Sequence, residues 1–343
     1  MTIIRVITKD SGVGLRKDLG IIKNILSSMP GLTIESVYID PALSKINEYN
    51  NFLQRNKRKL PPAVSRLLSS FELYFSTLRQ CSNVDINIFL ENIEPQFLAK
   101  ASFNILIPNQ EWTNDGSFNY LPWIDLALCK TEHSQKIFQP LCKDVIYTSF
   151  TSEDKKNDEL TQDYNLLFHL AGGSLQKGTA KLVDAWSKRP DWPLLKIIQH
   201  PKNQMKISYD NISYISGFVD DDALNSIQKS HGCHLCLSEA EGFGHSIVEA
   251  MSAEALVMTT NAPPMNEIIN ESRGLVVDFE HSAPQRLGRK YIVSDCALEA
   301  KIDELLGMST SDKRLKGRNA RQWFLENDDF FKNKLIEVIG QLL

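Results

Sequence analysis

Short apolar runs alternate with amphipathic stretches along the first half of the chain. Residues 3 to 7, IIRVI, predict a strand, and a turn with Gly12 and Gly14 follows it. Apolar residues at helical spacing then run from Leu19 to Met29. The same order of strand, turn and helix returns until the strand candidate DVIYTSF. Strands that alternate with helices form a mostly parallel sheet covered on both faces, so this half predicts an α/β domain.

A polar segment separates this half from a second one of similar size. Residues 151 to 165 have almost no aliphatic side chains, which is typical of a linker. The strand candidate YNLLFHLAG then begins a new series, with a glycine turn and the helical pattern GTAKLVDAWSKR. We therefore expect Rossmann-like domains at 1–155 and 156–326. Two such domains facing each other would leave a cleft at the carboxyl ends of their strands, where ligands bind in sheets of this kind.

Composition narrows the class of protein. The 343 residues are 42% hydrophobic and 23% charged, which is sufficient for two cores. A net charge of −4 does not indicate binding to nucleic acid or to an anionic membrane. No apolar run approaches the roughly 18 residues of a membrane span, and the N-terminus lacks the order of a signal peptide. Six cysteines are too few for a disulfide framework, so we expect a cytoplasmic protein.

The stretch SEAEGFGHSIVEAMSAEA combines two carboxylates with a glycine turn. Gly242 and Gly244 permit a tight turn, and the residues that follow have the spacing of a helix with one buried face. The first turn of a helix presents unpaired N–H groups, which favour phosphate. Glu241 precedes that turn, and Glu249 lies about one turn inside the helix. The two carboxylates could therefore bind hydroxyls on either side of a diphosphate, as a sugar nucleotide would present them.

This stretch and the later NAPPMNEIINESRGLVVD resemble the nucleotide-sugar site of the family 4 retaining glycosyltransferases. That family has the GT-B fold and a motif of a Glu, seven residues and a second Glu, as at Glu241 and Glu249. The turn at Gly12 and Gly14, the turn GGSLQKG, the segment ISGFVDDDAL and the terminal helices agree in order. The resemblance implies that residues 327–343 pack back on the first domain.

The resemblance also implies roles for single residues. Glu249 would bind the ribose hydroxyls, Glu241 would bind hydroxyls of the donor hexose, and Lys177 would hold the diphosphate. Catalysis would need no protein nucleophile, no cofactor and no metal. The further residues implied for nucleotide binding are Gly242, Phe243, Gly244, His245, Gly172, Gly173, Val219, Gly12 and Gly14. The alternative from the residues alone is that both glutamates only cap and solvate a helix start.

The sequence departs from the family pattern at three places. Many relatives have an Arg where this chain has Gly172, and an aliphatic residue where it has His245. Relatives often place a His after the fourth strand, where this chain has IPNQEW. We expect Asn109, Gln110 and Trp112 to form a loop beside the donor sugar or acceptor, with Glu111 as a catalytic candidate. These departures indicate a subfamily with its own sugar.

Three other motifs have ordinary structural explanations. Cys233 and Cys236 lie in an apparent strand, where residues three apart face opposite sides, so we expect a buried pair instead of a metal site. The three aspartates from Asp220 precede a helix and are typical of N-terminal capping instead of metal binding. The stretch GVGLRKDLG, with Asp40 as the ribose acid, lacks the third glycine of a dinucleotide fingerprint, which disfavours a dehydrogenase.

Two further segments have alternative interpretations. Trp112, Tyr120 and Trp123 could stack on an acceptor sugar or anchor the core. The basic residues 55–59 precede apolar positions between residues 64 and 78, which favour a core-facing helix over one that docks on a membrane.

The sequence thus favours a retaining glycosyltransferase that acts on an oligosaccharide, a polysaccharide or a lipid-linked acceptor. In the lipid-linked case, it would work at the membrane surface. A nucleotide-sugar epimerase of the same fold and a non-catalytic sugar-nucleotide-binding subunit remain as alternatives.

Overall fold

The protein folds into two compact units. Unit 1 comprises residues 1–150, 285–288 and 330–343, and unit 2 comprises residues 151–284 and 289–329. The computed structural model describes residues 1–9, 12–39, 56, 60–61, 64, 67–68, 70, 83–156, 160–204, 209–215 and 219–343.

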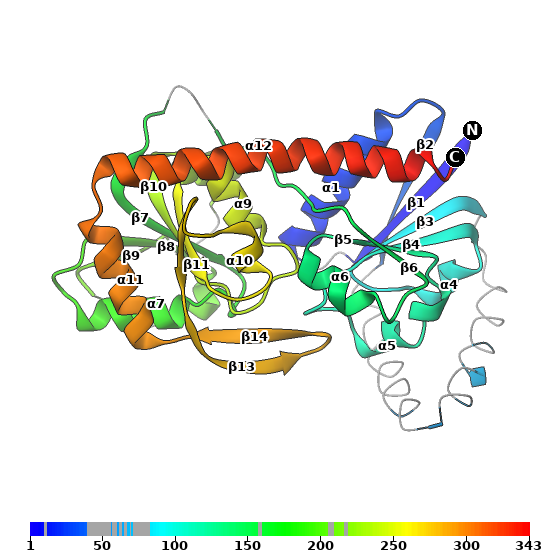
Figure 1. Ribbon diagram of the computed structural model, residues 1–343, viewed down its shortest axis with the longest axis horizontal. Coiled ribbons are helices and arrows are strands. Elements are labelled where there is room, and N and C mark those ends of the chain that lie inside the picture. The colour runs from blue at the N-terminus through cyan, green and yellow to red at the C-terminus, as the bar shows by residue number, and fades with distance from the viewer. Residues whose placement is uncertain are drawn as a thin grey trace. The chain divides into compact units, whose positions relative to one another are not determined.

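Unit 1 contains a parallel sheet of six strands in the order β2-β1-β3-β4-β5-β6 (Figure 1). All its strand pairs are parallel, as the alternation of strands and helices predicts. Its elements are β1 Thr2–Lys9, α1 Val13–Ser27, β2 Leu32–Ile39, β3 Val84–Leu90, α4 Pro95–Leu98, β4 Ala101–Ile107, α5 Asp115–Phe118, a 3-10 turn Leu121–Trp123, β5 Leu126–Cys129, α6 Glu132–Phe138 and β6 Asp144–Tyr147.

The core of unit 1 contains two of the aromatic residues considered for sugar stacking. Tyr120 is 3% exposed and lies in the core cluster, against which Trp123 packs with its ring 5.9 Å from that of Tyr120. These two residues therefore anchor the core. Trp112 is 47% exposed and remains available to a ligand.

Unit 2 repeats the plan with a parallel sheet in the order β12-β11-β10-β7-β8-β9. The two parallel sheets confirm the predicted α/β class. The elements are β7 Asp163–Gly172, α7 Thr179–Lys188, β8 Leu195–Gln199, a 3-10 turn Pro201–Asn203, β9 Ile212–Ile215, α8 Asp221–Ser230, β10 His231–Cys236, α9 His245–Ser252, β11 Leu256–Thr260, α10 Met265–Ile268, β12 Leu275–Val277, β13 Phe279–Gln285, β14 Gly288–Val293, α11 Asp295–Gly307 and α12 Thr310–Gly340.

Helix α12 contributes to both units, because residues up to 329 belong to unit 2 and those from Phe330 belong to unit 1. In unit 1 the ring of Phe331 lies 4.7 Å from that of Phe150, and both side chains are buried. The segment from Phe330 to Leu343 therefore packs within unit 1.

The hairpin of β13 and β14 is a feature that the sequence did not predict. The two strands form a separate sheet, and their connection, residues 285 to 288, belongs to unit 1. The turn residue Arg286 has φ 56°, a conformation that usually favours glycine or asparagine. With Arg-Leu in the turn instead of Asn-Gly, the usual hairpin signal is missing from the sequence.

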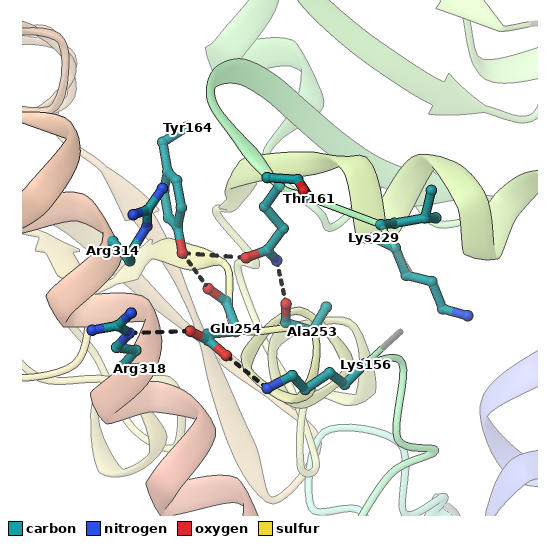
Figure 2. A pocket seen from close by; sticks show the side chains of 10 residues that line it. Lys156, Thr161, Tyr164, Lys229, Ala253, Glu254, Arg314 and Arg318 are labelled. Carbon is teal, nitrogen blue, oxygen red and sulfur yellow. Dashed lines mark hydrogen bonds and ion pairs between the residues drawn. The ribbon is translucent and has the colours of Figure 1, made fainter. Parts of the chain in front are cut away.

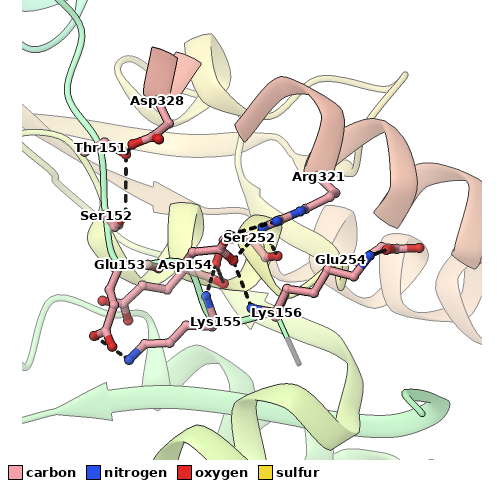
Figure 3. Close-up of polar contacts among 12 residues, drawn as sticks. Thr151, Ser152, Glu153, Asp154, Lys155, Lys156, Ser252, Glu254, Arg321 and Asp328 are labelled. Carbon is pink, nitrogen blue, oxygen red and sulfur yellow. Dashed lines mark hydrogen bonds and ion pairs between the residues drawn. The ribbon is translucent and has the colours of Figure 1, made fainter. Parts of the chain in front are cut away.

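Residues 151 to 156 were predicted to begin a linker, but they are packed into unit 2 (Figure 3). The Thr151 hydroxyl donates to the Asp328 carboxylate at 2.8 Å, and the Lys155 amide donates to the Ser252 hydroxyl at 2.8 Å. Thr151 and Lys155 are 3% and 6% exposed. Because small polar side chains can satisfy buried backbone groups, a polar composition did not mean an exposed segment here.

Most of the helix expected between residues 64 and 78 lies outside the described residues, as do the basic residues 55 and 57–59. At Val64, Leu67 and Leu68, which are described, the expectation of a core-facing helix is wrong. Their exposed fractions are 43%, 57% and 37%. Within the part of the chain that the structure describes, no helix combines the length and apolarity needed to cross a membrane.

Candidate functional site

The order of the strands in unit 2 determines where a ligand can bind. The chain runs from β7 outward through β8 and β9 and then returns to β10 on the other side of β7. The strand order therefore reverses between β7 and β10, and sheets of this kind bind ligands at the carboxyl ends of the strands at such a point. Most of the unit 2 residues predicted for the donor lie on the loops after β7 and β10, at the last residue of β7 or at the first residue of α9. The exceptions are Val219, between β9 and α8, and Glu249, within α9.

Gly178 allows the two loops to approach each other. It has φ 73°, and a Cβ atom at this position would lie 2.2 Å from the carbonyl oxygen of Leu237. Nearby, the amide of Glu239 donates to the carbonyl of Gln176 at 2.8 Å. A glycine is required here both for its backbone conformation and for space. The close approach brings Lys177 to the loop that carries Glu241.

Lys177 and Glu241 form an ion pair within unit 2. The same Glu241 oxygen accepts a hydrogen bond from the Ser238 hydroxyl at 2.5 Å, and the Lys177 ammonium lies 3.5 Å from the Ser246 hydroxyl. The two side chains are 21% and 12% exposed. Solvent and ligands can therefore reach a cation and a carboxylate that already have fixed positions.

Helix α9 begins directly beside this pair. Its N-cap is Gly244, with φ 107°, which leaves the first amides of the helix without a covering side chain. The first helical residue, His245, shares a hydrogen bond of 2.7 Å between its Nδ1 and the Ser152 hydroxyl. Phe243 is 3% exposed, and its ring lies 6.0 Å from that of His245. The first amides of α9 thus lie beside the loop that carries the Lys177 ammonium. Helix amides and a cation at one place are suited to binding an anion.

Glu249 points inward from α9. It is 2% exposed, and its carboxylate accepts a hydrogen bond of 3.3 Å from the side-chain amide of Gln228 in α8. The motif does not indicate Gln228, because that residue lies in another helix. A ligand hydroxyl at Glu249 would have to share the carboxylate with Gln228 or displace it.

His169, in β7, supports the loop that follows this strand. The sequence motifs did not indicate a role for this residue. Its Nδ1 lies 2.6 Å from the carbonyl oxygen of Leu235, and its Nε2 lies 2.8 Å from the hydroxyl of Thr179. Burial lowers the pKa of His169 to about 4, so the ring is neutral at pH 7. Because a carbonyl only accepts, Nδ1 carries the proton and Nε2 accepts from Thr179. The ring therefore ties the start of α7 to β10.

The carboxyl edge of the unit 1 sheet carries a second polar cluster. The ammonium of Lys130, after β5, contacts the Asp18 carboxylate of α1 at 2.6 Å, and both side chains are almost fully buried. It also donates to the Asn109 side chain at 3.0 Å, and Asn109 donates in turn to Glu91 at 3.1 Å. Of these four residues, the sequence indicated only Asn109. The others come from separate elements, which the strand order brings together.

Glu91 is the most unusual member of this cluster. It follows β3 with φ 69°, which is rare for a residue with a side chain. Burial raises the pKa of Glu91, although the hydrogen bond from Asn109 and the charge of Lys130 act in the opposite direction. A strained backbone and a perturbed carboxyl group at the end of a strand are features that cluster at functional sites.

The tip of the hairpin lies on the loop after β4, within unit 1. The Gln110 carbonyl accepts hydrogen bonds from the amides of Leu287 at 3.1 Å and Gly288 at 3.2 Å, and the Gln285 side chain lies 3.4 Å from the Glu111 carbonyl. Gln110 and Glu111 are 1% and 4% exposed. The loop therefore has a fixed conformation, with Glu111 buried and Trp112 outside.

The remaining candidates are placed as follows. Gly12 is the N-cap of α1 with φ 94°, and Gly14 lies inside that helix. Gly172 has φ 55°, and Gly173 follows it in the loop after β7. Val219, between β9 and α8, is partly exposed, and Asp40 lies outside the described residues.

The aspartate run and the cysteine pair have the structural roles that the sequence predicts. Asp220 caps α8 by accepting from the amide of Ala223 at 2.8 Å, which confirms the capping interpretation. Cys233 and Cys236 are buried in β10, and burial raises the pKa of each thiol to about 12. Among the described residues, no group of three or more His, Cys, Asp or Glu side chains is arranged to hold a metal ion.

Residues 150–322 match the family model described as glycosyl transferases group 1. No curated protein matches the sequence. The sucrose-phosphate synthase of Thermosynechococcus elongatus has 12% identity and a TM-score of 0.65, with 100% of this chain and 98% of that chain covered. HepE of Anabaena, in complex with UDP-glucose, has 13% identity and a TM-score of 0.64, with 99% and 100% covered.

A third similar structure is described as trehalose-6-phosphate from E. coli bound with UDP-2-fluoro glucose. It has 11% identity and a TM-score of 0.61, and the match covers 99% of both chains. Similarity over the full length at this level of identity establishes the fold, which is the predicted GT-B arrangement of two Rossmann-like domains.

Proposed function

The chain belongs to the group 1 glycosyltransferases, and from that membership we propose that it transfers a sugar from a nucleotide donor to a glycan-type acceptor with retention of configuration. The observation that carries this proposal is the meeting of Lys177, Glu241 and the start of α9 at the carboxyl ends of β7 and β10 in unit 2. One cation, one carboxylate and helix amides fit a sugar diphosphate better than they fit a simple anion.

In this proposal, the diphosphate binds the amides at the start of α9 and the Lys177 ammonium. Glu241 binds hydroxyls of the transferred sugar, and its ion pair with Lys177 holds both side chains in place before the donor arrives. Lys177 then offsets the charge that develops on the leaving phosphate, which lowers the barrier more than it strengthens ground-state binding. A donor phosphate oxygen takes the proton of the attacking acceptor hydroxyl, so no protein nucleophile or bound metal is needed.

Glu249 takes the ribose hydroxyls and exchanges part of its bond to Gln228 for them. Val219 lies beside the base, and the glycines at 172 and 173 let the backbone approach the donor. Because HepE of Anabaena is described in complex with UDP-glucose, we propose uridine nucleotides as the first donors to examine.

Unit 1 provides the acceptor side. Asn109, held by Glu91 and Lys130, and the exposed ring of Trp112 offer a hydrogen-bonding group and a stacking surface for a sugar. Glu111, in the same loop, is the catalytic candidate of unit 1. The glycine turn at Gly12 is a further part of the proposed site in unit 1. We place the reaction in the cytoplasm. The exposed Val64, Leu67 and Leu68 would bring the enzyme to a membrane when the acceptor is lipid-linked.

The test is nucleotide release from a panel of nucleotide sugars, measured with and without oligosaccharide and lipid-linked acceptors and with excess chelator. The proposal expects release that depends on an acceptor and survives the chelator. Conversion of the donor sugar without an acceptor would instead identify an epimerase, and binding without turnover would identify a binding subunit. Loss of activity that only added manganese or magnesium restores would refute the metal-free mechanism.

Two variants separate the roles of the glutamates. Glu249→Ala should weaken nucleotide binding with a smaller effect on kcat, because the ribose does not react. Glu241→Ala should lower kcat while nucleotide affinity stays within a fewfold of wild type. Unchanged nucleotide affinity of Glu249→Ala in calorimetry would contradict the ribose assignment.

A further inference from the structure

Unit 2 contains a cavity of about 310 Å³ that shares no lining residue with the proposed donor site (Figure 2). The end of the segment 151–156, the start of β7, the turn after α9 and one face of α12 surround it. Its charged lining residues are Lys156, Lys229, Glu254, Arg314 and Arg318. The lining therefore has four cations and one carboxylate.

Helix α12 packs closely against the turn after α9 beside this cavity. A Cβ atom at Gly317 would lie 2.2 Å from the carbonyl oxygen of Glu254 and 3.0 Å from the Tyr164 hydroxyl, so only glycine lets α12 pass this near. Glu254 itself has φ 67°, which turns the chain sharply after α9. Arg314 and Arg318 are one helical turn apart and flank the contact on the same face of α12.

Glu254 lies between two of the four cations, Lys156 and Arg318. One carboxylate oxygen lies 3.1 Å from the Lys156 ammonium and the other lies 3.5 Å from the Arg318 guanidinium. Figure 2 marks both ion pairs with dashed lines. Arg314 lies over the ring of Tyr164 at 5.9 Å. Considering only the described residues, no carboxylate lies within 4.0 Å of Arg314 or Lys229. Among the residues that line the cavity, Glu254 is therefore the one carboxylate beside four cations.

Cations one turn apart on a helix repel each other, and this repulsion is relieved when an anion lies between them. The Thr161 hydroxyl adds a neutral donor at the wall of the cavity, whereas the Tyr164 hydroxyl already donates to the Glu254 carbonyl at 2.9 Å. Arginine forks with a lysine point charge fit the several oxygens and the double charge of a phosphate group better than a single carboxylate.

We propose that this cavity is a second anion site, which binds a phosphate group through Arg314, Arg318 and Lys156, and that Glu254 takes the place of the phosphate when the site is empty. The proposal does not rest on the transferase activity, because the proposed donor site lies on other loops. The phosphate could belong to a soluble molecule or to a lipid headgroup.

The test uses inorganic pyrophosphate in calorimetry at low ionic strength, since salt screens exposed charges. The full chain carries Lys177→Ala, so that the donor site contributes less to the signal. We expect one saturable binding event, which the double variant Arg314→Gln and Arg318→Gln weakens by about tenfold or more. Lys334→Gln, on the same helix but outside the cavity, is the matched control and should leave the Kd unchanged.

Glu254→Gln makes the prediction sharper because the expected effect has the opposite sign. Removing the competing carboxylate should tighten pyrophosphate binding by severalfold, whereas a purely structural role for Glu254 would weaken it or leave it unchanged. Thermal unfolding of each variant confirms that it is folded. The proposal is overturned if no binding is seen, if the double arginine variant binds like wild type, or if Glu254→Gln does not bind more tightly.

Sedimentation with vesicles of phosphatidylglycerol in phosphatidylcholine identifies the source of the phosphate. Vesicle binding that the double arginine variant loses, and Lys334→Gln retains, supports a lipid headgroup. Pyrophosphate binding with the same dependence but no vesicle binding supports a soluble phosphate compound.

Discussion

Three glycines, at the end of β7 and in the loop after it, allow two energetic costs of this loop's conformation to be measured separately. Gly178 has both a left-handed φ of 73° and a Cβ position 2.2 Å from the Leu237 carbonyl oxygen. Gly172 has φ 55° but nothing within 4 Å of its Cβ position. Gly173 has neither constraint. Alanine at Gly173 should therefore cost little folding free energy. Alanine at Gly172 adds the cost of a left-handed backbone, and alanine at Gly178 adds a steric overlap to that cost.

The expected magnitudes follow from these geometries. An alanine in the left-handed region costs roughly 1 kcal/mol, which is the whole expectation for Gly172→Ala. In Gly178→Ala, the overlap with Leu237 adds roughly 1–3 kcal/mol, because the backbone of one loop must move. A total of about 3 kcal/mol corresponds to a fall in Tm of roughly 6–12 °C for a domain of this size. Gly173→Ala should stay within about 0.5 kcal/mol of wild type.

Thermal and urea unfolding of the three variants test this order. A second readout comes from the transfer rate at a temperature below every Tm. Moving Leu237 also moves Ser238 and Glu241, so Gly178→Ala should lose activity even while folded. Equal stability of Gly178→Ala and Gly173→Ala would refute the claim that the two loops meet at Gly178.

Other predictions concern single charges. Lys177→Ala should lower kcat by about ten- to a hundredfold while Tm changes little, because a charge-assisted hydrogen bond to the leaving phosphate is worth about 1.5–3 kcal/mol. If the variant keeps the wild-type kcat, the phosphate site lies elsewhere. Lys181→Ala, in the following helix, serves as the control. Asp18→Asn leaves the Lys130 ammonium buried without its counter-ion, so urea unfolding should show a loss of roughly 3–5 kcal/mol, and an unchanged midpoint would contradict this. Burial raises the pKa of Glu91, so the folded state holds this proton more tightly than the unfolded state does. The Glu91 contribution to stability is therefore present below its ordinary pKa and is lost as pH rises through the raised value, and Glu91→Gln should flatten this part of the stability–pH curve. An identical curve for Glu91→Gln would show that Glu91 is not the group responsible.

Local patterns in the sequence were sufficient for the class of fold. Each parallel strand is short and apolar, each helix has its own spacing, and Asp220 carries a capping signal within its own turn. The candidate site in unit 2 could also be proposed from the sequence, because Glu241, Gly244 and Glu249 lie within one strand–turn–helix segment. Such features depend on neighbours a few residues apart, which a single sequence displays directly.

Only the tertiary structure decided which distant segments meet. The pairs Lys130 and Asp18, Glu249 and Gln228, and Gly178 and Leu237 each join separate elements. The strand order determines these contacts, and periodicity contains no information about strand order. The polar residues 151 to 156 were predicted to begin a linker because the sequence does not show which segments pack against them. In the structure they pack within unit 2. A side chain's burial depends on what the rest of the chain places against it, and its own neighbours in sequence do not specify that.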